Sequence, residues 1–453
     1  MSYLREGKRK FLSKVGIDKA IGYTIFSRII QAGGGVFSVV FIAKFLSSTE
    51  QGYYYTFSSI LALQIFFELG LSSIITQYAS HEFAHLEFKD GVILGDEVHV
   101  SRLSSLLRFS FKWFSLISLV LFLALVICGF YFFNSFKNNE VINWKMPWLI
   151  LCLSTALNLI IDPILAFLDG IGFIADMSKT RLIQKTANII LLFCFLFAGF
   201  GLYAAALASL ISISINGFQI IFSRKFTLLK ALWRSMSTSV ISYSKEIFPY
   251  QWKVAVSWIS GYFIFYFFNP VLFATDGPIV AGQMGMTLAV LAGISSISMS
   301  WINTKVPLFS SLIAKKNFKE LDFIFHRVVL QLSGVNILGL ITFILGIIIL
   351  SNFNTQYSNR FLSINAVILL SIVTLINQFV GSWATYLRCF KKEPFLIASI
   401  VVAAMCIAST LILGNSFGVT GMVYGYTCIV AFVSLPWAFI IFRNKSSQFK
   451  SKD

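Results

Sequence analysis

Two cations interrupt apolar stretches of this sequence. Arg28 lies in SRIIQAGGGVF (27–37), seven residues into an apolar run, roughly 10 Å from the near end of a helix. A charge inside a bilayer costs about 2.5–3.5 kcal/mol on the insertion scale, so it must face a wet cavity or a partner. Arg28, and by similar reasoning Lys253, are candidates for gripping an anionic phosphate group. The alternatives are snorkelling to the interface or, for Arg28, a structural pair with Glu68.

Two carboxylates, Glu68 and Asp162, lie deepest in the apolar runs. One interpretation is that they carry protons or sodium ions in a coupled cycle. The other, which we favour, is that they compensate the charges of Arg28 and Lys253. Asp162 precedes Pro163, which we expect to kink its helix and free backbone carbonyls.

The segment HEFAH (81–85) matches the zinc-peptidase pattern, with His81 and His85 as ligands and Glu82 as general base. The run NLIIDPILAFLDG (158–170) could supply Asp169 as a third ligand, as in site-2-type intramembrane proteases. HEFAH is short and polar-flanked, and such a protease would need only a few of the apolar runs. We therefore prefer to interpret HEFAH as an extension of the second span at headgroup level, with no metal bound.

Glycines follow both cations. Gly33, Gly34 and Gly35 come after Arg28, and Gly261 comes after Lys253. We expect these glycines to act as helix hinges. The correspondence suggests that the chain is a two-fold repeat, and in transporters built this way the substrate site lies between the repeats, beside interrupted helices.

The elements that must position these residues are apolar helices. The chain has 453 residues, 57% hydrophobic and 12% charged, with a mean hydropathy of +0.80, which excludes a soluble protein of this size. Since about 20 apolar residues span a bilayer, we predict twelve spans, at 21–45, 53–78, 106–133, 147–168, 182–200, 202–222, 247–269, 277–304, 328–350, 361–387, 394–413 and 418–442. The predicted fold is all-α, with two six-helix lobes around a central cavity.

The charged loops give the orientation. With twelve spans, 31 of the 36 Lys and Arg residues fall on the side that holds both termini, which predicts that this side is cytoplasmic. The predicted lobes are 1–223 and 247–453, joined by a cytoplasmic loop at 224–246. The opposite loops are short, so we expect no catalytic domain there and no enzymatic activity.

The stretch LSSTEQGYYYTFSSILALQIFFELGLSSIITQYAS (46–80) resembles the second span of polysaccharide and O-antigen flippases. These belong to the multidrug, oligosaccharidyl-lipid and polysaccharide exporter superfamily. The resemblance rests on the TEQGYYY turn, the FELGL segment and the SxxITQYAS exit, together with the length and the twelve spans.

The resemblance implies alternating-access flipping of undecaprenyl-pyrophosphate-linked oligosaccharide repeat units across a bacterial inner membrane, for lipopolysaccharide or a related polysaccharide. It implies a monomer without a cofactor, with possible partners in membrane lipids, a polysaccharide polymerase and glycosyltransferases, and none in nucleic acid. Arg28 and Lys253 would grip the pyrophosphate, and a proton or sodium gradient could drive the cycle. The alternative within the same fold is a coupled exporter of drugs or other small molecules.

Overall fold

The computed structural model describes residues 30, 33–35, 37–89, 92–136, 142–234, 241–353, 357–390 and 392–452. Almost all of their secondary structure is helical. The exception is an antiparallel hairpin of strands β1 (Leu86–Lys89) and β2 (Val92–Gly95). Below, the first half means residues before 235 and the second half means residues after 240. The basic end is the end rich in Lys and Arg.

The second predicted span is broken in its middle. Its parts are α3 (Ser48–Leu61), the 3-10 turn η1 (Ala62–Gln64), α4 (Ile65–Glu68) and α5 (Leu71–Phe83). Between α4 and α5, Leu69 and Gly70 have left-handed backbones, with φ of 51° and 68°. That conformation suits glycine but strains leucine. The helix axis bends there by 41°, directly after Glu68.

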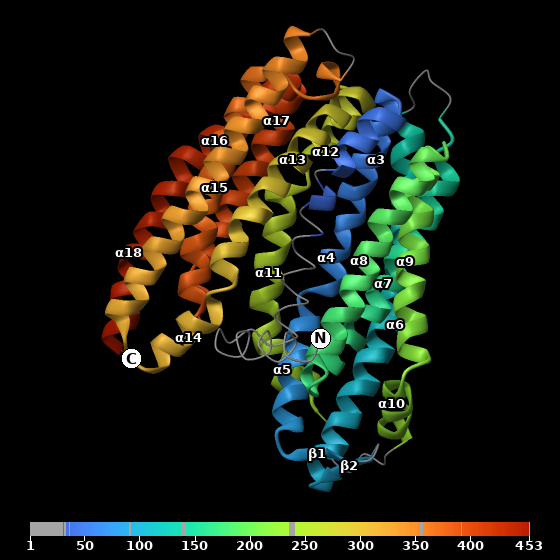
Figure 1. The fold of residues 1–453 in the computed structure, drawn as a ribbon, viewed down its shortest axis with the longest axis vertical. Helices are drawn as coiled ribbons and strands as arrows, with labels where there is room; N and C mark the ends of the chain where they lie inside the picture. Colours follow the sequence, from blue (N-terminus) through green and yellow to red (C-terminus); the bar gives the residue numbers. More distant parts are fainter. Residues whose placement is uncertain are drawn as a thin grey trace, which may run out of the picture.

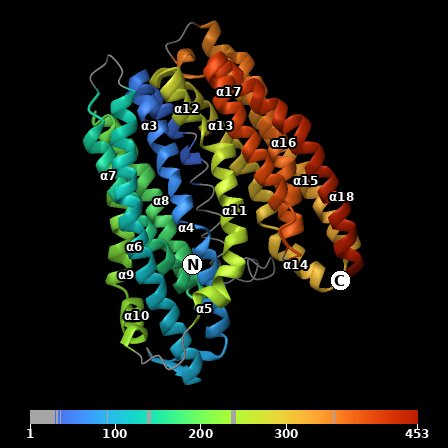
Figure 2. The same cartoon turned by 180° about the vertical axis from the view of Figure 1, so that it is seen from behind.

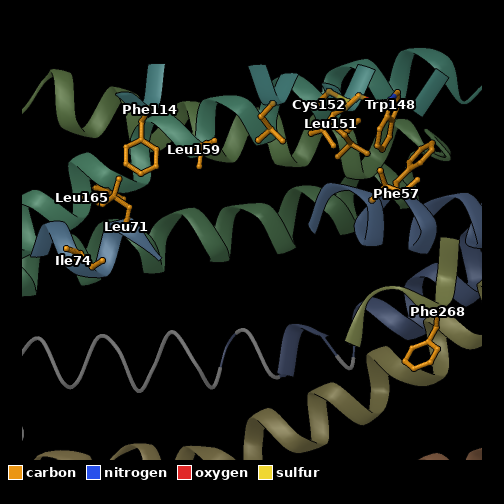
Figure 3. Close-up of a cluster of buried hydrophobic side chains, with 14 of the residues drawn as sticks. Phe57, Leu71, Ile74, Phe114, Trp148, Leu151, Cys152, Leu159, Leu165 and Phe268 are labelled. Carbon is orange, nitrogen blue, oxygen red and sulfur yellow. Dashed lines mark hydrogen bonds between the residues drawn. The ribbon is translucent and has the colours of Figure 1, made fainter. Parts of the chain in front are cut away.

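The rest of the first half is a bundle of long helices: α6 (Glu97–Ser135), α7 (Lys145–Gly170), α8 (Ile174–Phe197), α9 (Tyr203–Ile221) and the short amphipathic α10 (Arg224–Arg234). Gly199 and Gly201 make the tight turn between α8 and α9 with positive φ angles, as the sequence predicts. Figure 3 shows part of the packed interior, where Phe57 of α3 lies beside Trp148 of α7, with ring centroids 5.1 Å apart.

The second half follows a similar plan. Its elements are the π-helical turn η2 (Tyr243–Ile247), α11 (Phe248–Phe265), α12 (Phe268–Thr275), α13 (Pro278–Asn303), α14 (Val306–Ala314), α15 (Phe318–Asn352), η3 (Ser358–Arg360), α16 (Ile364–Arg388), α17 (Leu396–Ile429), η4 (Val430–Ser434) and α18 (Leu435–Lys452).

Helix α17 folds back on itself. Gly418 has φ 59° and ψ −146°, which no helix contains. A Cβ at Gly425 would meet the side chain of Ser409, sixteen residues earlier, whereas a straight helix would separate them by about 24 Å. The two predicted last spans, 394–413 and 418–442, therefore form an antiparallel pair that turns at Gly418.

The helices support the predicted span count. Among the described residues, nine helices are long and apolar enough to cross a membrane, or ten when α3 and α5 count as one bent span. The 54-residue segment Leu396–Phe449 is one of these nine, and its reversal at Gly418 makes it two crossings. The helical stretch Gly33–Phe45 lies in the first predicted span. The all-α membrane fold of about twelve spans is confirmed.

The two halves form two lobes that meet at one end (Figures 1 and 2). At the end opposite the basic end, both halves share one core, in which the Tyr53 ring lies 5.0 Å from Phe273 and 5.4 Å from Phe133. At the basic end, the second half has a separate core around Phe309, Phe325 and Tyr386. The lobe boundaries at 223 and 247 stay a prediction. The segment between them contacts the first half, since Ile241 donates its N–H to Ser105 Oγ at 3.4 Å.

Candidate functional site

The two predicted anion-gripping residues cannot be placed together. Arg28 lies outside the described residues. Lys253 lies on α11, but its side chain is also outside the described part of the chain. Around Gly33, Gly35 and Gly261 an added Cβ would meet nothing within 4 Å, whereas at Gly34 it would collide with the Ile189 side chain. The anion-gripping and hinge roles remain predictions.

Glu68 and Asp162 do come together. Both line a cavity of about 480 Å³ within the first half, here called the carboxylate cavity. Its polar lining includes Glu68, Ser72, Asp162, Arg181, Lys185 and Asn188. The break at Leu69 and Gly70 ends α4 directly after Glu68. Asp162 comes from the middle of α7, where it accepts a hydrogen bond from Asn158 Nδ2 at 2.6 Å.

Helix α8 supplies cations to this cavity that the sequence analysis did not select. In the sequence, Arg181 and Lys185 contribute only to the count of Lys and Arg residues on the side that holds both termini. Arg181 Nη1 lies 2.7 Å from Asp169 Oδ2, which makes a neutral pair. The remaining described charges of the lining are Glu68, Asp162 and Lys185, which sum to one excess formal negative charge when both carboxylates are ionised. The signal was present in the sequence, because residues 181, 184, 185 and 188 are polar and share one helical face.

The zinc alternative fails on geometry. Helix α5 ends at Phe83, so His85 lies beyond it. Glu82 is already occupied, with its carboxylate 2.8 Å from Arg102 Nε and 2.7 Å from His99 Nδ1. Asp169 is held by Arg181. No group of three His, Cys, Asp or Glu residues in the described part of the chain could hold a metal ion, so His81, His85 and Asp169 do not meet.

The HEFAH segment instead belongs to a charged cluster at the basic end, formed by Glu82, His99, Arg102 and Glu246 and here called the Arg102 cluster. Arg102 also contacts Glu246 Oε2 through Nη2 at 2.7 Å, and the Tyr78 hydroxyl donates to the Glu246 carbonyl at 2.6 Å. Burial raises the pKa of Glu82, but hydrogen bonds from Arg102 and His99 outweigh it and hold that pKa below its ordinary value. The cluster ties η2 of the second half to α5 and α6.

A second and larger cavity, of about 570 Å³, lies between α3 of the first half and helices of the second half and is here called the central cavity. Helices α3, α11, α12, α13, α16 and α17 line it, with polar side chains that include Tyr55, Tyr266, Asn269, Asn377, Gln378 and Tyr426. Among the described residues, no charged side chain lines it. The sequence pattern had selected none of these residues, although Tyr55 belongs to the quoted TEQGYYY turn.

Three polar atoms in this lining have no protein partner in the described part of the chain. They are the Tyr55 hydroxyl, Asn269 Oδ1 and Gln378 Nε2, on side chains that are only 7%, 6% and 3% exposed. A buried polar group without a hydrogen bond costs about 1–3 kcal/mol. Each of these atoms is itself buried in the cavity wall, so it can bond a molecule in the cavity only after a side-chain movement exposes it.

The central cavity is closed at the end opposite the basic end. There Gln51 donates Nε2–H to the carbonyls of Gly282 (2.9 Å) and Arg360 (3.0 Å), and Arg360 Nη2 donates to the Leu46 carbonyl at 2.7 Å. A Cβ at Gly52 would overlap the Pro278 carbonyl. Only glycine allows this close approach of α3 and α13.

Asp276, which directly follows α12, also lies at this end. Its carboxylate accepts the Val419 N–H at 2.9 Å, directly after the reversal at Gly418.

No protein-family model matches the chain, and no curated protein matches it significantly. Solved structures do match its fold. A ligand complex of the MATE multidrug transporter DinF-BH superposes with a TM-score of 0.62 at 15% identity, covering 94% of this chain and 95% of that one.

Inward- and outward-facing structures of a multidrug resistance MATE family transporter also match. Each has a TM-score of 0.56, at 13% and 15% identity, and they cover 88% and 96% of this chain and 94% and 96% of theirs. The chain thus has the fold of the MATE transporters of the MOP superfamily.

Proposed function

We propose that this chain flips undecaprenyl-pyrophosphate-linked oligosaccharide units across a bacterial inner membrane by alternating access. The observation that carries the proposal is the uncharged lining of the central cavity, which is mainly apolar and aromatic with a few hydroxyl and amide groups. Sugars present hydroxyl groups that both donate and accept, and their apolar ring faces pack on tyrosine. The lining supplies hydroxyl and amide side chains, among them Ser58, Ser296 and Asn377, and the exposed Tyr266 supplies an aromatic ring.

The pyrophosphate would be gripped by Arg28 and Lys253, as the sequence predicts, while the lipid tail stays in the bilayer. Both cations belong to helices predicted to lie beside the central cavity. The central cavity is less suited to bind a cationic drug, because its described lining holds no carboxylate to attract a cation.

The cycle would require the contacts at the end opposite the basic end to break. In the described state the lobes share a core there, while the second half has a separate core at the basic end. We infer that this state accepts its cargo from the basic end, which the positive-inside rule makes cytoplasmic. Release on the other side would then need Arg360 and Gln51 to lose their partners across the lobes.

The carboxylate cavity would couple the cycle to an ion. Its one excess negative charge matches one monovalent cation, a proton or a sodium ion. The ion can drive the cycle only if it binds the two states with different affinity. The break beside Glu68 is a place where such a difference could arise, because the backbone there bends by 41°.

The test is reconstitution in proteoliposomes with a fluorescent undecaprenyl-pyrophosphate oligosaccharide, followed by quenching from outside. We expect flipping by the wild-type protein and its loss in Arg28→Ala and Lys253→Ala. In cells, normal surface polysaccharide at normal levels of both variants would refute the proposed grip. Efflux of a cationic dye such as ethidium, without any flipping of the lipid-linked sugar, would instead identify a drug exporter, the function named for the matching multidrug transporters.

A further inference from the structure

A third cavity lies between the other two. This side cavity of about 160 Å³ is lined by residues that include Tyr54, Ser58, Leu151, Asn188, Leu192 and Ser209. It shares Ser58 with the central cavity, and it shares Asn188 and Ser209 with the carboxylate cavity. The three spaces thus follow one another without a gap in their lining residues.

Helix α3 is the wall between the central and side cavities. Tyr55 and Ser59 face the central cavity, Tyr54 faces the side cavity, and Ser58 borders both. The Ser58 side chain is small and exposed, and its hydroxyl donates to the Tyr54 carbonyl at 3.1 Å. The two cavities therefore meet at a polar residue with little bulk.

On the far side, α8 and α9 continue the polar lining. Asn188 Nδ2 donates to Ser212 Oγ at 3.2 Å, and both residues line the carboxylate cavity with Glu68 and Asp162. A volume of about 160 Å³ holds about five water molecules at their liquid volume. Hydroxyl and amide groups along the route can solvate a small cation in steps.

We propose that a small monovalent cation reaches Glu68 and Asp162 from the central cavity, through a polar passage past Ser58, Asn188 and Ser209. The cation's role as the coupling ion rests on the proposed function, but the passage itself does not. A cargo that fills the central cavity covers the Ser58 mouth of this passage. Ion exchange at the carboxylates and cargo binding then take place in turn, which links the two events without direct contact.

The experiment measures access to position 68 with silver ion, a small cation that reacts with thiols. The six native cysteines are replaced, Glu68→Cys is introduced, and the purified protein is exposed to silver ion for set times. Thiols left unreacted are then counted with a maleimide after denaturation. Ser58→Phe narrows the passage, and Asn188→Leu removes one of its polar groups. Both should slow the reaction by at least about tenfold.

Ser209→Val and Ser214→Val form a matched pair on α9. Ser209 lines the passage, whereas Ser214, which donates to the Leu210 carbonyl at 2.8 Å, lines none of the three cavities. We expect slower reaction for Ser209→Val and an unchanged rate for Ser214→Val. Equal thermal unfolding of all variants excludes misfolding as the cause.

An unchanged silver reaction in Ser58→Phe and Asn188→Leu would overturn the passage, since the ion would then arrive by another route. Equal slowing by Ser209→Val and Ser214→Val would overturn it too. The readout needs no lipid-linked sugar and no transport. If the substitutions slow the silver reaction but the protein fails to flip oligosaccharide, the passage is supported and only the proposed cargo is refuted.

Discussion

The two lobes share a helical plan but differ in the polarity of their interiors. The first half places Glu68, Asp162, Arg181 and Lys185, all half-buried, around one cavity. The second half has a neutral counterpart on α13, α15 and α16, in which Asn336 Nδ2 donates to Ser298 Oγ at 3.1 Å and Ser298 donates to Gln378 Oε1 at 3.0 Å. All three side chains are almost fully buried.

The charges of these second-half helices lie near helix ends. In α15 they fall within the first ten residues, in α16 only Arg388 is charged, and α13 has none. Neutral amides can satisfy one another inside a bilayer, whereas an uncompensated charge requires a counter-ion. The comparison predicts that only the first half binds the coupling ion. The neutral cluster of the second half holds its helices together.

The largest expected effect comes from neutralising the first-half carboxylates. Glu68→Gln and Asp162→Asn keep shape but remove the excess negative charge of the cavity. We expect ion-dependent transport to fall by up to about 150-fold, the upper range for coupling between two sites. Transport rates with and without a proton or sodium gradient measure this. If both variants keep their full gradient dependence, the contrast between the lobes has no functional meaning.

The Arg102 cluster tests how firmly η2, the turn before α11, is held to α5 and α6 at the basic end. Arg102→Ala leaves Glu82, which is only 3% exposed, without its cation. We expect a loss of about 2–3 kcal/mol in unfolding free energy, measured by thermal unfolding in detergent. Lys112→Ala, an exposed cation on the same helix, is the matched control and should change little.

The same cluster predicts acid sensitivity. The pKa of Glu82 is held below its ordinary value of 4.5, because hydrogen bonds from Arg102 and His99 outweigh burial. Its stabilisation is therefore fully present above about pH 4.5 and is lost as the pH falls through the lower folded value. Glu82→Gln should reduce the difference in melting temperature between pH 7 and pH 4. An unchanged difference would exclude Glu82 as a source of acid lability.

A smaller effect is expected where the lobes meet. In Gly52→Ala the added Cβ overlaps the Pro278 carbonyl, while in the control Gly346→Ala it meets nothing within 4 Å. We expect the first substitution to weaken the contact between α3 and α13 by about 2 kcal/mol. The lobes should then separate at that end. Spin labels at the exposed Phe200 and Phe353, one on each half, report the distance. Identical distance distributions in both variants would contradict the assigned closure.

The smallest effect should come from the neutral cluster. Asn336→Leu removes the hydrogen bond to Ser298 together with the unpartnered Oδ1 atom of Asn336. The two changes partly offset each other, so we expect the free energy of unfolding to fall by about 1 kcal/mol. The dependence of transport on the ion gradient should not change. Loss of gradient dependence here would show that the second half also handles the ion.

Much of the fold was predictable because hydropathy is a local and additive property. The spans, the turn at Gly199–Gly201 and the deep position of Glu68 and Asp162 can all be read from neighbouring residues. The zinc interpretation of HEFAH, which we did not prefer, shows the limit of such local patterns. Five residues carry no information about Arg102, which comes from the next helix and engages Glu82.

The sequence by itself determined the number of spans, the charged end and the residue types that lie deep in the bilayer. Only the tertiary structure decided which of them meet. Arg181 and Lys185 became partners of the carboxylate cavity, and Gln51 met Arg360 although 309 positions separate them. Such contacts depend on how tilted and broken helices pack, to which the bend at Gly70 and the reversal at Gly418 contribute. Hydropathy along the chain does not encode that packing.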